Sequence, residues 1–200
     1  MPKFYNFFLI VACELDAFFS ALISFIPGRL GNLLRRIFYK CKFRSSKNFL
    51  IGTGCKFCSP FNMTLNNSVS IGNNSYLDAN GGLIEIGENV SINMNAHINA
   101  SCGGLISIGD NCLIGPGVLM RTANHNFSML NKPIRNQGHN FSDIIIEDDC
   151  WIGANAIILK GVRIGSGAVI GAGSVVTKNI PSMAVAVGSP ARVNHFRHKK

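Results

Sequence analysis

Aliphatic residues recur at every sixth position in the C-terminal half of the chain. The ladder consists of Ile146, Ile152, Ile158, Ile164, Ile170 and Val176. Small or β-branched residues stand four positions after the first five rungs: Cys150, Ala156, Val162, Ala168 and Ser174. A period of six fits neither the 3.6-residue repeat of a helix nor the two-residue alternation of a strand. It fits a triangular coil in which each side is a short strand plus a turn, so the pattern predicts a parallel β-helix.

Glycine and asparagine mark the expected corners of these coils. Gly153, Gly165 and Gly171 each follow a rung directly, which suits tight corners where a Cβ atom would clash. Looser versions of the same spacing occur over residues 50–120, again with Asn and Gly between the apolar positions. Because each strand is too short to be stable alone, we expect the stacking of neighbouring coils to supply the stability.

A polar, Asn-rich insertion over residues 121–143 interrupts the spacing. It contains His125 and His139, each in a His-Asn-Phe-Ser setting. Excursions from a repeat scaffold are common sites of function because the coils hold them rigidly. The expected organisation is an N-terminal helical, basic segment (1–48), a β-helix domain (49–180) with the insertion as a protruding loop, and a C-terminal tail (181–200).

Residues 4–26 form an apolar, aromatic-rich stretch that contains Glu14 and Asp16 and ends at Pro27. About 20 such residues can span a membrane, but two central acids make insertion costly. Three interpretations stay open: a helix packed on the end of the β-helix or on a neighbouring subunit, an interfacial helix lying on a membrane, and a true span. The basic residues that follow support peripheral membrane association through residues 4–47.

Composition and charge narrow the class of protein. Hydrophobic residues make up 47% of the chain and charged residues 14%, which argues against disorder. The formal net charge of +9 is uneven. Residues 1–48 contain eight Lys and Arg against two acids, whereas residues 49–190 contain seven against eight. A nearly neutral body with basic ends fits a membrane surface or an anionic cofactor, and we expect no nucleic-acid partner.

The seven cysteines favour a reducing, cytoplasmic compartment. Cys55 and Cys58 form a lone C-x-x-C that no second pair or nearby histidine completes, so no metal site is expected. Cys112 and Cys150 fall on small inward positions of the repeat, where they are expected to pack as core thiols.

Several segments resemble a known family. They are the Ala-Asn-His-Asn-Phe motif around residue 125, the run WIGANAIILKGVRIGSGAVIGAGSVVTKNIP from residue 151, and the GSPARV motif from residue 188. Together they resemble the left-handed β-helix acyltransferases, most closely the galactoside, maltose and polysaccharide O-acetyltransferases, over about residues 50–193. The resemblance implies a left-handed β-helix, acetyl-CoA as co-substrate, and a homotrimer with sites between adjacent solenoids. It also implies transfer to a sugar hydroxyl in surface polysaccharide or lipopolysaccharide biosynthesis. We expect a cytoplasmic location, at the inner face of the membrane if residues 4–47 associate with it.

Transfer of an acetyl group from a thioester to a hydroxyl requires a base for the hydroxyl proton. Histidine is the usual base, since its ordinary pKa near 6.5 leaves it largely neutral at cytoplasmic pH. The resemblance assigns this role to His125. From the residues alone, a loop histidine satisfied by a backbone carbonyl is equally open.

The resemblance also assigns the cofactor residues. Ala154 and Ala172 match positions whose backbone contacts the pantetheine arm, and Thr177 and Lys178 match the pair near the nucleotide. Arg192 matches a cation at the phosphates, where charge-assisted hydrogen bonds are strong. For the two cations, ordinary surface charge is the alternative.

Three further residues are weaker acceptor-site candidates. His139 is interpreted as a substrate contact or a solvated residue rather than the base. Asn95 aligns with a substrate-contacting asparagine near a gap, and Trp151 is expected at a subunit seam, with core packing as the alternative. His97 is expected to point outward from a regular coil.

Three other functions stay open at this stage. An N-acetyltransferase of an amino-sugar nucleotide would use the same fold and cofactor, because fold does not fix the acceptor. A carbonic-anhydrase-like enzyme would need three histidines converging on zinc, a pattern that His97, His125 and His139 do not reproduce. The last is a non-catalytic scaffold.

Overall fold

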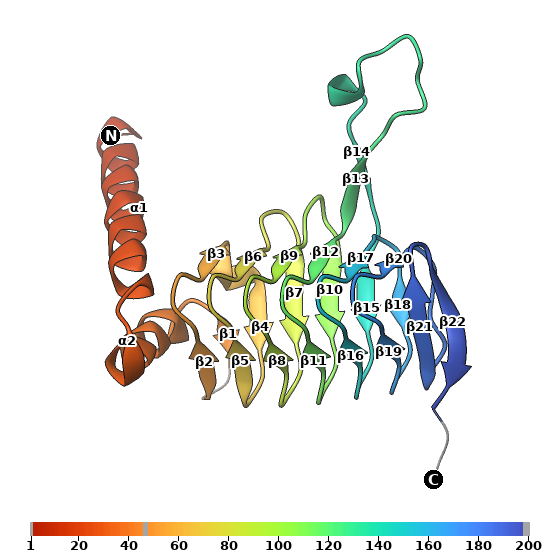
Figure 1. The fold of residues 1–200 in the computed structure, drawn as a ribbon. Coiled ribbons are helices and arrows are strands. Elements are labelled where there is room, and N and C mark those ends of the chain that lie inside the picture. Colours follow the sequence, from red (N-terminus) through yellow and green to blue (C-terminus); the bar gives the residue numbers. More distant parts are fainter. Residues whose placement is uncertain (1, 46–47, 198–200) are drawn as a thin grey trace.

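The computed structural model describes residues 2–45 and 48–197, and it forms a left-handed parallel β-helix with two N-terminal helices and one projecting hairpin (Figure 1). Lys47 of the basic segment and the last three residues lie outside the described residues. Three parallel sheets form the sides of the coil.

Sheet A contains β1 (Arg44–Ser45), β4 (Met63–Leu65), β7 (Leu83–Ile86), β10 (Leu105–Ile108), β15 (Ile144–Ile146) and β18 (Arg163–Ile164). Sheet B contains β2 (Phe49–Ile51), β5 (Val69–Ile71), β8 (Ser91–Ile92), β11 (Leu113–Ile114), β16 (Trp151–Ile152), β19 (Val169–Ile170), β21 (Ala184–Gly188) and β22 (Ala191–Phe196). Sheet C contains β3 (Lys56–Cys58), β6 (Tyr76–Asp78), β9 (His97–Asn99), β12 (Leu119–Arg121), β17 (Ile157–Ile158) and β20 (Val175–Val176).

The six-residue ladder is confirmed as the core. Successive rungs fall on successive sheets, so rungs that are 18 residues apart stack directly: Ile146 on Ile164, Ile152 on Ile170, and Ile158 on Val176. All six side chains are at most 1% exposed. The small residues between them, Cys150 and Ser174 among them, are buried as well. Each sheet therefore has one column of buried rungs, and passage through the three sheets in turn explains the period of six residues.

Close approach of the next coil explains the glycines after the rungs. A Cβ atom on Gly153 would lie 2.6 Å from the backbone nitrogen of Ala172, and one on Gly165 would lie 2.5 Å from that of Ser182. Neither of these glycines has a positive φ. The left-handed conformation falls two residues later instead, for example at Asn155 and Gly173.

Two helices close the N-terminal end of the solenoid. The sequence predicts one hydrophobic helix, whereas the structure has α1 (Pro2–Ser24) and a second helix, α2 (Gly28–Lys40), in the basic segment. Arg35 on α2 is 1% exposed and donates hydrogen bonds to the carbonyl oxygens of Ile51, Ile23 and Ile26. It therefore ties both helices to the first coil, and the end of α1 contacts that coil through Ser24.

Regular pairing extends past the expected end of the domain. β21 pairs in parallel with β19, and β22 then returns antiparallel to β21, so the expected tail widens sheet B at the C-terminal end. Short 3₁₀ turns occur at Pro60–Asn62 and Ile134–Asn136. Within residues 2–45 and 48–197, no helix is both long enough and apolar enough to cross a membrane.

Candidate active site

The insertion forms a β-hairpin that rises from the end of β12. β13 (Ala123–His125) pairs antiparallel with β14 (His139–Phe141) and projects from the solenoid (Figure 1). Thr122, which is fully buried, anchors its base: the Thr122 hydroxyl donates to the carbonyl of Ser101 and accepts from the Ser101 amide. These hydrogen bonds between Thr122 and Ser101 therefore position the base of the hairpin.

His125 and His139 face each other across this hairpin. They are register partners, and their ring centroids lie 4.1 Å apart with an interplanar angle of 41°. Both side chains are exposed. The structure thus brings the predicted base and its competitor to one place, which the sequence does not indicate because they are 14 residues apart.

The hairpin loop is fixed by two polar residues that the sequence analysis missed. Gln137 donates hydrogen bonds to the carbonyls of Met129 and Lys132 and accepts one from the Met129 amide. Asn126 donates to the Gln137 carbonyl and accepts from Asn140. Such long-range side-chain bonds have no periodic signal in a sequence.

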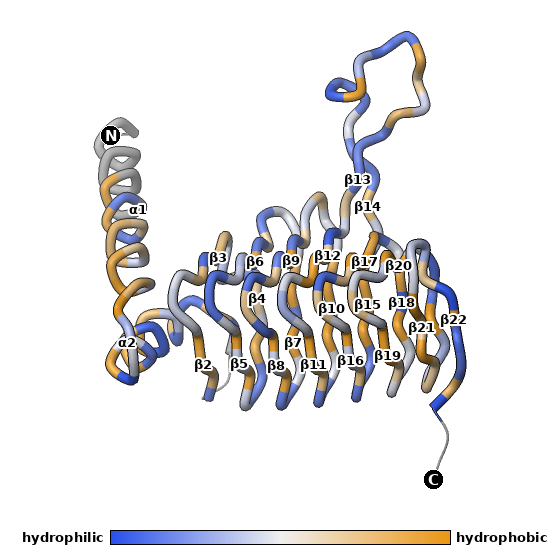
Figure 2. Tube along the Cα trace, in the orientation of Figure 1, coloured by the Kyte–Doolittle hydropathy of each residue, from blue (hydrophilic) through white to orange (hydrophobic). Residues whose placement is uncertain are grey.

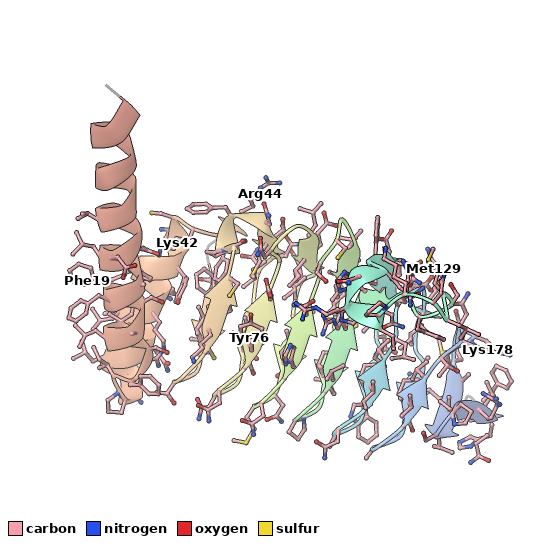
Figure 3. The ribbon with its side chains drawn as sticks, turned by 90° about the horizontal axis from the view of Figure 1, so that it is seen from above. Phe19, Lys42, Arg44, Tyr76, Met129 and Lys178 are labelled. Atoms are coloured by element: carbon pink, nitrogen blue, oxygen red, sulfur yellow. The ribbon has the colours of Figure 1, made fainter. Side chains whose placement is uncertain are left out.

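Large apolar side chains are exposed around the loop, and Figure 3 shows Met129 among them. The set comprises Phe127, Met129, Leu130, Ile134 and Phe141, each at least half exposed. A cluster of this kind on a projecting loop is typical of a surface that another molecule covers.

Ala154 and Ala172 lie one above the other in a column at the corner between sheets B and C. Each stands at the turn that leads into a strand of sheet C, β17 or β20. The Gly173 amide donates to the Ala154 carbonyl at 2.8 Å, and the backbone nitrogen of Ala172 lies directly against Gly153. The two predicted cofactor alanines are therefore adjacent, and their small side chains leave the corner open.

The predicted cations meet at the C-terminal end of the solenoid. Lys178 and Arg192 line one hollow of about 250 Å³ together with Asn179, Ile180, Ala191 and Val193. Thr177 precedes Lys178 and is exposed at the end of β20. Val187, the register partner of Arg192, lies against Gly171. The alanine column therefore runs toward the hollow that contains both cations.

Within one copy, the alanine column and the hairpin occupy opposite edges of sheet C, whereas Thr177 and Lys178 follow the end of β20 on the edge of the hairpin. The alanine column stands where the strands of this sheet begin, whereas the hairpin leaves where β12 ends. The length of a sheet C strand separates the alanine column from the base of the hairpin. The hairpin projects away from the solenoid (Figure 1). One chain therefore presents the alanine column and the histidine hairpin on different edges.

The weaker candidates lie elsewhere on the solenoid. Asn95 occupies a left-handed corner with φ of 59°, a conformation that asparagine tolerates well, so the fold itself accounts for asparagine there. Trp151 is 55% exposed in an outward hollow of about 300 Å³ with Leu113 and Val169, and the core-packing alternative is wrong. His97 points outward as expected and contacts the ring of Tyr76 edge-on.

A polar cluster on sheet C was not singled out from the sequence. The Tyr76 hydroxyl donates to Asp78, which also accepts from the Asn99 amide at 2.9 Å. Hydrogen bonding with Cys58, burial and the Asp78 carboxylate all raise the pKa of Tyr76. Among the described residues, Asn99 Oδ1 and Ser101 Oγ are buried polar atoms without a hydrogen-bond partner. Both residues lie near the base of the hairpin, where Ser101 contacts Thr122.

The cysteines in the coils serve packing. Cys112 and Cys150 are 0% and 1% exposed, and their thiols donate to the carbonyls of Glu147 and Gly165. Proximity to the Cys150 thiol, together with burial, raises the pKa of Cys112. In the part of the chain that the structure describes, no group of three or more His, Cys, Asp or Glu side chains could hold a metal ion.

Comparison with known proteins identifies the repeat. A family model described as the hexapeptide repeat of succinyl-transferase matches residues 105–119 and 143–178, which include the ladder. Over these two stretches the chain is similar to the hexapeptide-repeat transferases.

Two curated relatives of this hexapeptide-repeat protein are galactoside O-acetyltransferases. The enzyme of Escherichia coli is 38% identical over 130 residues, 62% of either chain. That of Lactococcus lactis is 44% identical over 89 residues, 44% of this chain and 42% of the relative. The matched stretches thus span less than two thirds of the length of either relative.

Solved structures extend the similarity over most of the hexapeptide-repeat chain. A maltose O-acetyltransferase from Clostridium difficile is 28% identical, with a TM-score of 0.66 over 93% of this chain and 86% of that one. A hexapeptide-repeat acetyltransferase from Vibrio cholerae, complexed with acetyl coenzyme A, is 25% identical, with a TM-score of 0.65 over 93% and 87%. An N-acyltransferase from Bacillus cereus, complexed with an amino-sugar nucleotide and coenzyme A, shares the fold at 24% identity, with a TM-score of 0.70 over 82% and 89%.

Proposed function

We propose that this protein is an acetyl-CoA-dependent O-acetyltransferase that acts on a sugar hydroxyl. The observation that carries the proposal is His125, an exposed histidine on a hairpin that rises from a hexapeptide-repeat solenoid. The likeness to galactoside and maltose O-acetyltransferases supports both the reaction class and the saccharide acceptor.

In the proposed reaction, His125 is the general base. Its neutral imidazole takes the proton of the acceptor hydroxyl while that oxygen bonds to the acetyl carbon. The bond from this carbon to sulfur then breaks, and the leaving thiolate recovers the proton from the imidazolium. The histidine thus ends neutral and the products are the acetyl ester and free CoA. A base of this kind typically contributes about 10²–10⁴-fold to the rate.

The wall of the solenoid is the proposed CoA site. The open corner at Ala154 and Ala172 leaves room for the pantetheine arm against the backbone. Lys178 and Arg192, with Thr177 beside them, stand at the end of this column, where two cations in one hollow suit the phosphates. The bound thioester would supply the activated acetyl group.

A homotrimer would complete the site in this proposal. Because the hairpin and the alanine column occupy opposite edges of sheet C, the hairpin of one copy would reach the alanine column of the next. The exposed apolar residues of the loop fit such a contact with a second copy. His139, Trp151 and Asn95 remain candidates for the acceptor side.

The proposed pathway is the synthesis of surface polysaccharide or lipopolysaccharide, in the cytoplasm on the inner side of the membrane. The supporting observations are the saccharide-acetylating relatives and the free, buried thiols of Cys112 and Cys150.

An acceptor panel tests the proposal. The purified protein is incubated with acetyl-CoA and with galactosides, maltosides or amino-sugar nucleotides, and free thiol is measured over time. Thiol release with a sugar that offers hydroxyls only, together with ester formation on that sugar, is expected. Amide formation on the amino-sugar nucleotides alone contradicts the O-acetyltransferase and supports N-acetyl transfer.

A further inference from the structure

Helix α1 exposes one continuous apolar stripe. Its members are Val11, Leu15, Phe18, Phe19 and Leu22, and Phe25 in the turn after α1 continues it; all six are 37–67% exposed. Their spacing of three and four residues puts them on one face of the helix. Figure 3 shows Phe19 on the side of α1 that faces away from the solenoid, and the described part of α1 is mostly hydrophobic in Figure 2. Large aromatic residues in such a continuous strip are unusual for a surface that faces water.

Helix α2 repeats the pattern and adds cations. Leu30, Leu33 and Ile37 are 44–63% exposed and lie opposite the face that Arg35 and Tyr39 bury against the solenoid. At 100° per residue, Arg29, Arg36 and Lys40 line one flank of this apolar strip. We name these nine apolar residues and three cations of α1 and α2 the end cap.

The cations of the end cap are available for an outside partner. The salt bridges in residues 2–45 and 48–197 involve Lys42, Arg163 and Arg197, and none involves Arg29, Arg36 or Lys40. Arg29 and Arg36 line a hollow of about 260 Å³ with Asn32, Leu33 and Leu50. Lys42 pairs with Asp16, so one of the two acids on α1 is already neutralised.

The placement of the end cap distinguishes a lipid surface from a second copy. The cap closes the N-terminal end of the solenoid, and α1 lies across the long axis of the coils (Figure 1). Copies that associate along their flanks leave this end open. Pairing end to end would bring two sets of like charges together, which is unfavourable. An anionic surface has the complementary charge.

We propose that the end cap binds the surface of an anionic lipid bilayer. Helix α1 lies flat in the interface with its apolar stripe among the acyl chains, and Arg29, Arg36 and Lys40 contact lipid phosphates. The long axis of the solenoid then stands upright on the membrane. In a trimer, three caps would face one plane, and their combined binding would be much tighter than that of a single cap.

Vesicle flotation tests this proposal without any need for acetyl transfer. Full-length protein is mixed with vesicles of phosphatidylcholine alone, or of phosphatidylcholine with one quarter phosphatidylglycerol. Strong binding to the anionic vesicles, weakened by salt, is expected. Arg29→Gln with Arg36→Gln should weaken it about 30-fold, at about fivefold per cation. Phe18→Ser with Leu22→Ser should remove binding to both vesicles.

The matched control is Lys132→Gln with Arg135→Gln, which removes the same charge from the exposed hairpin loop. This variant should float like the wild type. Circular dichroism should show equal folding for every variant. Binding that is absent in the wild type, or equal in the cap and control variants, overturns the proposal. So does a doubled particle mass that Phe18→Ser with Leu22→Ser abolishes, because a second copy would then occupy the cap.

Discussion

The ladder and the hairpin are neighbours in sequence, but different interactions stabilise them: burial of side chains in the ladder and a few hydrogen bonds in the hairpin. From Ile144 to Val176 a buried residue recurs at intervals of four positions or fewer, and each coil repeats its pairing with the next. After Ala123 the side chains of the hairpin are exposed or partly exposed, and a few hydrogen bonds from Thr122, Asn126 and Gln137 set its shape. The ladder is self-sufficient within one chain. The hairpin, with its exposed apolar loop, is suited to contact a second copy of the chain.

The largest expected effect is a loss of activity on substitution of a hairpin residue, with no loss of stability in the ladder. His125→Ala is expected to lower kcat for acetyl transfer about 10²–10⁴-fold, because it removes the base. The unfolding transition should stay that of the wild type, since the side chain is exposed. Steady-state thiol release measures the first effect and thermal melting the second. Unchanged turnover contradicts the assignment of His125.

Substitution of a buried residue of the ladder should instead lower the stability of the protein. Ile158→Ala is expected to lower the free energy of unfolding by about 2–5 kcal/mol, because the fully buried side chain stacks between Met120 and Val176. The matched control is Ile157→Ala, which truncates the outward-facing neighbour in the same strand. Denaturant unfolding compares the two. Equal losses would mean that the rungs do not dominate the stability of the coil.

Substitution of the two cations at the proposed CoA site should have an effect of intermediate size, on the KM for acetyl-CoA. Lys178→Gln with Arg192→Gln should raise the KM for acetyl-CoA about 10- to 100-fold, since each charge-assisted hydrogen bond contributes about 1.5–3 kcal/mol and the site is exposed. The expected effect on kcat is small, because these residues stand far from the acetyl group. Initial rates at varied acetyl-CoA measure both. A KM like that of the wild type places the phosphates elsewhere.

The smallest effect is expected at His139. Its ring packs against that of His125, and a cross-strand pair of this kind contributes about 0.2–1 kcal/mol. His139→Ala should therefore lower kcat by up to about fivefold, and His139→Phe, which restores a packed ring, should recover most of it. Rates for the two variants at saturating substrates distinguish them. Loss of activity in both variants would instead indicate a polar contact with the acceptor.

The sequence predicted the ladder because burial on three sides imposes a strict period. Ile146 and the rungs that follow, the corner at Gly153 and the core thiol Cys150 could all be identified from that period. The resemblance contributed the adjacent alanines, and the structure shows that Ala154 and Ala172 form one column.

Other features could not be predicted because they depend on contacts without a period. The pairing of His125 with His139 results from the register of a hairpin, and the role of Gln137 from bonds across its loop. The second N-terminal helix escaped prediction because its buried face includes Arg35, whose guanidinium donates to Asn32 on the same helix and to carbonyls of distant segments.

The central claim is that the wall of one copy and the hairpin of another form each active site. Complementation tests it most directly. His125→Ala and Ala172→Trp, the latter intended to block the corner, are each expected to be inactive as pure proteins. When equal amounts are unfolded and refolded together, random trimers should regain about a quarter of wild-type thiol release, since mixed trimers contain one interface with both intact residues. Activity no higher than that of the separately refolded variants would contradict the claim.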